Sequence, residues 1–348
     1  MKILKKLSYI ALSALMTFSI STASFADSTS SSKNEVITIG ANLNQKQKAS
    51  ILNYFGVDQN NPNIIYVNNA QERKYLAGIA PEKQLGHVTM SSAYVVPTND
   101  GGINVKTSNI TWVTSSMIAT TLSTAGVENA NVVAAAPFPV SGTGALTGII
   151  IGFEKSTGDK LTENKKKLAN KELVTTGKLA NQVGQDKATG IVNDAKTKVI
   201  KDDIKDKEKI EKIVKDTANN YNVNLTTGDI NIIVNLLSNI SNQNYNYKDM
   251  KDTLANVSTN VRSNLKDKGE NIDVNGIIGK ASDWLNNNKE ANSFFKQFDD
   301  SKLSKDAVVN TTSDGLTNAK QIAGDVANQA KESGLIDKII NFFKSLFN

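Results

Sequence analysis

Hydrophobic positions recur with two different periods along this chain, and the change of period divides it near residue 159. Before that point, short apolar runs with strand-like alternation are separated by helical stretches that end at glycine. After it, apolar residues recur every three or four positions among many Lys, Asp and Asn residues, which is typical of amphipathic helices. The pattern predicts an α/β or α+β domain with a mixed sheet, in two or three layers, followed by a mainly α-helical region.

The first part is expected to interleave strands with helices. We predict strands at residues 35–39, 63–67, 91–96, 103–110 and 131–136, and helices at 44–55, 69–77 and 114–125. Each of these helices is followed by a glycine, which is the usual helix stop. The sequence Asn-Asp-Gly-Gly at 99–102 is a hairpin signal, so the strands on either side of it are expected to pair.

The second part is expected to consist of helices without a fixed repeat. Apolar spacing predicts helices at 199–214, 230–240, 250–265 and 281–298, and the stretch at 316–330 is rich in small residues. We divide this part into a charged helical segment at 160–220, a helical region at 221–333 and an amphipathic terminal helix at 334–348. A bundle or an elongated helical array fits this pattern better than a solenoid.

The N-terminus has the pattern of a secretory signal peptide. Lys2, Lys5 and Lys6 precede an apolar stretch at 7–20, and Ser-Phe-Ala at 24–26 offers a cleavage site. We therefore expect a signal peptide at 1–26, a disordered linker at 27–34 and a secreted, extracellular protein. Retention at the cell envelope is an open alternative.

Composition excludes several kinds of site. The chain has no cysteine and one histidine, which excludes disulfides, thiolate metal sites and a histidine-based zinc site, so no metal or cofactor is expected. Its formal charge of +6 includes the three N-terminal lysines, and most remaining lysines alternate with Asp or Glu. Nucleic-acid surfaces concentrate basic residues on one face, so no nucleic-acid partner is expected. The oligomeric state is open.

Several short blocks of the first part follow one another in a recognisable order. They are ITIGANL at 37–43 with Gln47, Glu-Arg and Tyr-Leu within 72–76, SSAYV at 91–95, VKTSNIT at 105–111, Thr-Ala-Gly at 124–126 and SGTGALTG at 141–148. Over about residues 36–161 the chain resembles a family of exported Firmicutes proteins, domain of unknown function 1002. The resemblance implies a secreted or envelope-associated protein without an established activity, so it supplies no catalytic residues.

The glycine-rich stretch PFPVSGTGALTGII at 137–150 suggests a phosphate-binding turn. Its glycines are spaced Gly-x-Gly-x-x-x-Gly, however, and two prolines separate it from the preceding strand, so the dinucleotide fingerprint is not met. We expect Ser141 or Thr143 to cap a helix that packs closely on the sheet. An anion or polar ligand at this helix start is the alternative, with Ser141, Gly142, Thr143 and Gly144 as its contacts.

Carboxylates are the remaining catalytic candidates. Glu72 is the weak first choice because it lies in a family-like block, with Asp100, Glu128 and Glu154 as other acids that could form a sugar-cleaving pair. The alternative is that Glu72 has a salt-bridge or helix-surface role beside Arg73.

Two further groups of polar residues are candidate sites. Ser92, Asn109 and Thr111 could line a polar ligand groove, or could be ordinary hydrogen-bonded strand and turn residues. A Ser-His-Asp triad would have to use His87, with Ser91 and Ser92 nearby. No nucleophile-elbow motif surrounds these serines, so we expect His87 to be an incidental surface or strand-end residue.

The C-terminal stretch LIDKIINFFKSLFN carries a strong apolar stripe. Its members are Leu335, Ile336, Ile339, Ile340, Phe343, Leu346 and Phe347. Such a helix suits a membrane surface or a docking partner, and equally the protein's own helical part. The leading hypothesis is a non-enzymatic, envelope-associated binding protein whose partner is a cell-wall polymer, a membrane surface or an envelope protein. The alternatives are a carboxylate-dependent cell-wall hydrolase and a membrane-active protein that uses this terminal helix.

Overall fold

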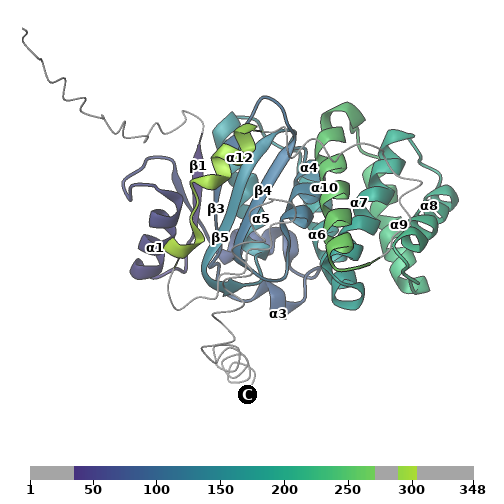
Figure 1. Ribbon diagram of the computed structural model, residues 1–348, viewed down its shortest axis with the longest axis horizontal. Coiled ribbons are helices and arrows are strands. Elements are labelled where there is room, and N and C mark those ends of the chain that lie inside the picture. The colour runs from purple at the N-terminus through teal and green to yellow at the C-terminus, as the bar shows by residue number, and fades with distance from the viewer. Residues whose placement is uncertain (1–34, 271–288, 304–348) are drawn as a thin grey trace, which may run out of the picture. The chain divides into compact units, whose positions relative to one another are not determined.

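The computed structural model describes residues 35–270 and 289–303 (Figure 1). A mixed five-stranded sheet lies in the first part of the chain, and helices dominate the second part, as the hydrophobic pattern predicted. The strands are β1 (Val36–Gly40), β2 (Ile64–Val67), β3 (Ser92–Pro97), β4 (Ile103–Ile110) and β5 (Ala130–Val140), in the order β2-β1-β3-β5-β4. The β1–β2 and β4–β5 pairs are parallel, whereas β3 is antiparallel to both of its neighbours.

The predicted hairpin between β3 and β4 is wrong, because β5 lies between these two strands. The turn at 99–102 instead contacts the start of β5: the Gly102 N–H donates to the Asn129 side chain at 2.8 Å, and the Ala130 N–H donates to the Gly102 carbonyl at 3.1 Å. β5 is apolar at successive positions, so it can be covered on both faces, as a central strand must be. The turn signal depends only on neighbouring residues, so it cannot indicate that a strand later in the sequence lies between β3 and β4.

Helices cover both faces of the sheet, which gives three layers. On one face, α4 (Ser115–Ala125) and α5 (Thr143–Thr157) pack against the side chains of Val132 and Ala134. On the other, α1 (Gln45–Phe55) and α12 (Lys289–Lys296) pack against Val133 and Ala135. The short helices α2 (Asn69–Leu76) and α3 (Glu82–Leu85) lie beside α5. Two of the predicted helix starts are well defined, because Asn44 and Asn68 cap α1 and α2 through reciprocal hydrogen bonds with glutamine.

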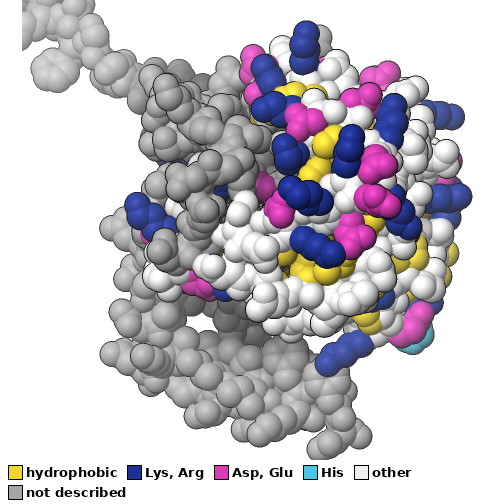
Figure 2. Space-filling model, turned by 90° about the vertical axis from the view of Figure 1, so that its right-hand side faces the viewer, with side chains coloured by type: hydrophobic (Ala, Val, Ile, Leu, Met, Phe, Trp, Pro, Cys, Tyr) yellow, Lys and Arg dark blue, Asp and Glu magenta, His cyan; other side chains and the backbone are white. Residues whose placement is uncertain are grey.

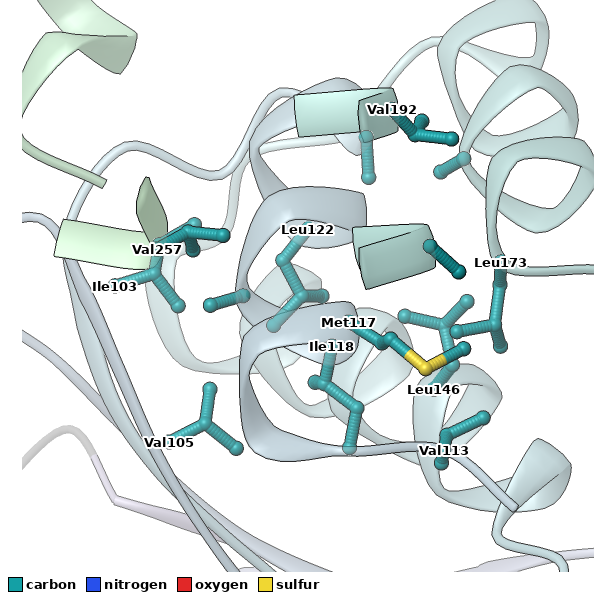
Figure 3. Close-up of a cluster of buried hydrophobic side chains, with 14 of the residues drawn as sticks. Ile103, Val105, Val113, Met117, Ile118, Leu122, Leu146, Leu173, Val192 and Val257 are labelled. Carbon is teal, nitrogen blue, oxygen red and sulfur yellow. The ribbon is translucent and has the colours of Figure 1, made fainter. Parts of the chain in front are cut away.

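The second part consists of long helices. They are α6 (Glu163–Val183), α7 (Gln185–Lys201), α8 (Lys207–Asn220), α9 (Thr227–Ser241) and α10 (Tyr247–Asp267), and a short 3-10 helix, η1 (Asp300–Lys302), follows α12. Of the long helices, α6, α7 and α10 pack on α4, while α8 and α9 pack on α6 and α7. Figure 3 shows the contact: the α4 side chains Met117, Ile118 and Leu122 lie among Val105 of β4, Leu173 of α6, Val192 of α7 and Val257 of α10. One hydrophobic core therefore runs from the sheet into the helices, with α4 as the shared element.

The predicted helix at 199–214 is wrong as a single element. α7 ends at Lys201 and α8 begins at Lys207. Between them Asp203 has a left-handed backbone with φ of 46°, and the Asp206 side chain caps α8 by accepting from the Lys209 N–H at 2.8 Å. The apolar spacing continues across this break, which is why periodicity alone could not locate it. The predictions at 230–240 and 250–265 fall inside α9 and α10, and the described part of that at 281–298 contains α12.

Candidate functional site

Glu72 lies in the first turn of α2 and is buried, with 1% of its surface exposed. The hydroxyl of Thr143 donates to Oε1 at 2.6 Å, and the hydroxyl of Thr89 donates to Oε2 at 3.0 Å. Burial raises the pKa of Glu72 above its usual value, although these two hydrogen bonds act in the opposite direction. The neighbouring Arg73 binds Glu82 instead, with a shortest N–O distance of 2.6 Å, so the expected Glu72–Arg73 surface pair does not form.

The glycine-rich turn forms the other wall of this site. Gly142 has φ of 90°, and a Cβ there would lie 2.9 Å from a methyl carbon of Val113. A Cβ on Gly144 would lie 3.1 Å from Glu72 Oε2 and 2.9 Å from a methyl carbon of Thr89. Gly144 therefore lets the first turn of α5 approach the carboxylate closely, and Gly142 lets the backbone just before that turn lie against Val113.

The expectation that Ser141 or Thr143 caps α5 is wrong. Gly142 occupies the N-cap position and has no side chain to donate or accept. The Ser141 hydroxyl donates to the Gln84 carbonyl at 2.8 Å, while the Thr143 hydroxyl is engaged by Glu72. Helix starts favour negative charge, because their backbone N–H groups point outward and the helix dipole is positive there. The group beside this helix start is the carboxyl group of Glu72, which accepts a hydrogen bond from the Thr143 hydroxyl.

The other polar candidates have structural hydrogen bonds, and they do not converge on one point. The Ser92 hydroxyl accepts from the Gly40 N–H at 3.2 Å, and the exposed Thr111 donates to the Val140 carbonyl at 2.9 Å. Asn109 has φ of 58° at a register shift in β4, and its side-chain amide donates to the Ala136 carbonyl at 2.9 Å. A ligand role for these residues stays a prediction.

Glu154 does not complete a sugar-cleaving pair with Glu72. Glu154 lies near the end of α5, where it pairs with Lys166 at 3.0 Å. Because the Glu72 carboxylate contacts residue 143 and a helix rises about 1.5 Å per residue, the two acids lie roughly 16 Å apart along α5. Glycosidase carboxylates lie about 5–5.5 or 6.5–9.5 Å apart. His87 is exposed, and its Nδ1 lies 3.4 Å from the Arg73 guanidinium.

An ion pair that the sequence analysis missed lies in the shared core. Lys196 of α7 and Glu172 of α6 are both fully buried, with an N–O distance of 2.7 Å. The Lys196 ammonium also donates to the Thr120 carbonyl at 2.7 Å, and the Thr124 hydroxyl donates to Glu172 at 2.5 Å. Burial lowers the pKa of Lys196, and its attraction to Glu172 opposes that shift. This pair ties α4, α6 and α7 together.

The polar network continues from α7 toward α8 and α10. Thr120 donates to Asn193 at 2.8 Å, and the Asn193 amide donates to Ser258 of α10 at 2.9 Å. Asp194 accepts from Ser258 and, at 2.6 Å, from the hydroxyl of Tyr221. One signal in the sequence could have identified Lys196, because it shares a helix face with Val192 and Val199, where a solvated lysine would not be expected.

The described residues also bear on metal and membrane binding. Across 35–270 and 289–303, no three His, Asp or Glu side chains are grouped so that they could hold a metal ion. In the same ranges, no helix has both the length and the apolar character needed to cross a bilayer. The tail candidates Leu335, Ile336, Ile339, Ile340, Phe343, Leu346 and Phe347 lie outside the described residues.

Comparison with known proteins identifies the family. Residues 39–257 match the family described as "Protein of unknown function (DUF1002)". The chain belongs to this family. The uncharacterized protein YpuA of Bacillus subtilis (strain 168) is 34% identical over 240 residues, which cover 68% of this chain and 82% of YpuA. No solved structure matches the chain. The DUF1002 match confirms the resemblance inferred from the short blocks, and it extends beyond them to include the Glu172–Lys196 pair.

Proposed function

We propose that this DUF1002 protein is exported and acts at the cell envelope by binding a partner, without catalysing a reaction. The observation that carries the proposal is the position of Glu72. The acid that the sequence favoured for catalysis is 1% exposed and is held by Thr143 and Thr89 at the start of α5. A carboxyl in this position stabilises the contact between α2 and α5, and a polymeric substrate could not reach it without moving both helices.

The charged surface is consistent with this proposal. Figure 2 shows Lys and Arg side chains interspersed with Asp and Glu on one face of the protein. On α8, Lys215 pairs with Glu211 at 2.6 Å and Lys212 with Asp216 at 3.4 Å, each one helical turn apart. Because neighbouring charges cancel, this face lacks the strong positive field of a nucleic-acid surface. The candidate partners remain a cell-wall polymer, a membrane surface or an envelope protein.

Cell fractionation tests the envelope role. The full chain would be compared with a version truncated after Ser333 and with the double variant Ile339→Asp/Phe343→Asp, whose apolar stripe is interrupted. The variant Asp337→Asn keeps the stripe and serves as the matched control. We expect the full chain and the control in the wall or membrane fraction, and the other two in the medium. Recovery of all four in the medium would contradict envelope retention.

A carboxylate-dependent hydrolase is the second candidate, because the raised pKa of Glu72 is a property that general acids share. The purified mature protein and the variant Glu72→Gln would be incubated with purified cell-wall glycan, and the released reducing ends would be measured. We expect no turnover from either protein. Turnover by the native protein that Glu72→Gln abolishes would establish the hydrolase and refute the non-enzymatic proposal.

A further inference from the structure

The face of the sheet that α1 covers carries a cluster of aromatic side chains. We call this the docking face and define it by Tyr54 and Phe55 of α1, Tyr94 of β3, and Val133 and Ala135 of β5, all of them buried. In Figure 1, α12 crosses the sheet on this face, although it begins about 150 residues after the end of β5 and about 190 residues after the end of β3. The docking face is therefore already a surface that accepts a helix.

α12 and the residues just after it contact the docking face through apolar side chains. Ala291, Phe294 and Phe295 lie in α12 at i, i+3 and i+4, and Phe298 lies two residues beyond the end of the helix, at i+7 in the sequence. The ring of Phe298 lies 5.4 Å from that of Tyr94, 5.9 Å from Tyr54 and 6.2 Å from Phe55, between ring centroids. These distances are typical of favourable aromatic pairs, so Phe298 is the central anchor.

A buried polar contact fixes the end of this segment. The Lys106 ammonium donates to the Phe298 carbonyl at 2.6 Å and lies 3.1 Å from the Asp300 carboxylate. The hydroxyls of Tyr54 and Ser108 donate to the same carboxylate at 2.9 and 2.7 Å. The docking face thus recognises an apolar stripe followed by a negatively charged group.

The residues of the docking face lie within the part of the chain that matches the family, and α12 does not. Tyr54, Phe55, Tyr94 and Lys106 all lie within the DUF1002 match at 39–257, whereas α12 lies outside it. The face therefore belongs to the family fold, and the helix that covers it comes from a part of the chain that the family match does not include.

The C-terminal stretch repeats the docking pattern of α12. Its residues Ile339, Phe342, Phe343 and Leu346 have the same i, i+3, i+4, i+7 spacing, and Phe-Phe-Lys occurs in register at 294–296 and at 342–344. The stretch lacks an acidic residue corresponding to Asp300. We expect it to fit the aromatic pocket while gaining less from Lys106.

We propose that residues 339–346 of the same chain dock on this face in place of α12. The 68 residues between Glu270 and Ile339 can reach any point of the sheet, since even a continuous helix of that length spans about 100 Å. With α12 docked, the terminal apolar stripe is available to an outside partner. With 339–346 docked, the stripe is covered. The balance between the two occupants would control the availability of the tail.

Photocrosslinking in the purified full chain tests this exchange independently of envelope binding. Benzoylphenylalanine would replace Phe342, and crosslinked peptides would be mapped by mass spectrometry. We expect crosslinks to peptides that contain Tyr54 and Phe55 or Tyr94, within a monomer. In the variant Phe298→Ala the yield should rise at least about tenfold, because removing a buried aromatic anchor weakens the competing helix.

Two further variants keep the test decisive. Asp300→Asn retains the apolar contacts of α12 but weakens its polar anchor, so it should also raise the yield even if Phe298→Ala fails to fold. Lys296→Ala changes an exposed residue of α12 and should leave the yield unchanged. Crosslinks confined to dimers would assign the occupant to a second copy and overturn the proposal. Crosslinks elsewhere, or a yield that neither Phe298→Ala nor Asp300→Asn raises, would overturn it as well.

Discussion

Removing one partner of the buried Lys196–Glu172 pair should strongly destabilise the protein. The variant Lys196→Met fills a similar volume but leaves the Glu172 carboxylate fully buried without its counter-ion. Breaking a buried pair in this way costs about 3–5 kcal/mol. A domain's total stability is about 5–15 kcal/mol, so the loss is a large fraction of it.

Urea unfolding followed by circular dichroism at 222 nm measures this loss as a lower midpoint. The matched control is Lys215→Met, which removes an exposed pair with Glu211 on α8, where 52% of the lysine side chain is exposed. Exposed pairs contribute less than about 1 kcal/mol, so this variant should unfold close to the native protein.

A double variant separates the ion pair from general packing damage. Lys196→Met combined with Glu172→Leu removes both charges, and apolar replacement of a whole buried pair is often neutral. We expect it to recover at least about 2 kcal/mol relative to Lys196→Met alone, which is the range of coupling between contacting residues. The reasoning is refuted if Lys196→Met lies within about 1 kcal/mol of the native protein, which would mean that Glu172 is neutralised or solvated at little cost.

Glu72→Gln and Gly190→Ala test two other buried contacts, and Gly228→Ala is a control. Because the folded pKa of Glu72 is raised above 4.5, its contribution to stability is complete below that pH and is lost as pH rises through the folded pKa. The free energy of unfolding of the native protein should therefore fall relative to that of Glu72→Gln as pH rises above 4.5, and a pH-independent difference would contradict this. Gly190→Ala would place a Cβ 2.6 Å from the Tyr221 hydroxyl oxygen and should cost about 1–3 kcal/mol in thermal unfolding. Gly228→Ala, whose nearest neighbour atom would be 3.6 Å away, should cost nothing measurable.

Local signals in the sequence predicted the helices well where a capping residue or a glycine marks the end of the helix. Asn44 and Asn68 cap helices whose start the sequence placed within a residue or two, and Gly126 ends α4 in a left-handed conformation as expected. The mixed sheet and the helical second part followed from the change of hydrophobic period. The order of the strands could not be predicted from this change of period, because the pairing of β5 between β3 and β4 depends on contacts between segments distant in sequence.

The candidate site was predicted only in part, for a related reason. The sequence selected Glu72, Thr143 and Gly144 separately, and the structure brings them together across 71 residues of separation between Glu72 and Thr143. The sequence could not indicate that the Glu72 carboxylate accepts a hydrogen bond from the glycine-rich turn. Lys196 was missed because a lysine in a charged helical segment is usually solvated, and only the packing of α4 and α6 on α7 buries it.

The contact between Glu72 and the first turn of α5 has a consequence for any outside anion. A phosphate or sulfate that approached this helix start would compete with a carboxylate tethered to the same fold. The effective concentration of a tethered group is on the order of millimolar or higher, so a free anion would need to exceed that level or bind far more tightly. The start of α5 therefore already has a hydrogen-bonding partner from its own chain at Thr143, and an outside anion would have to displace it.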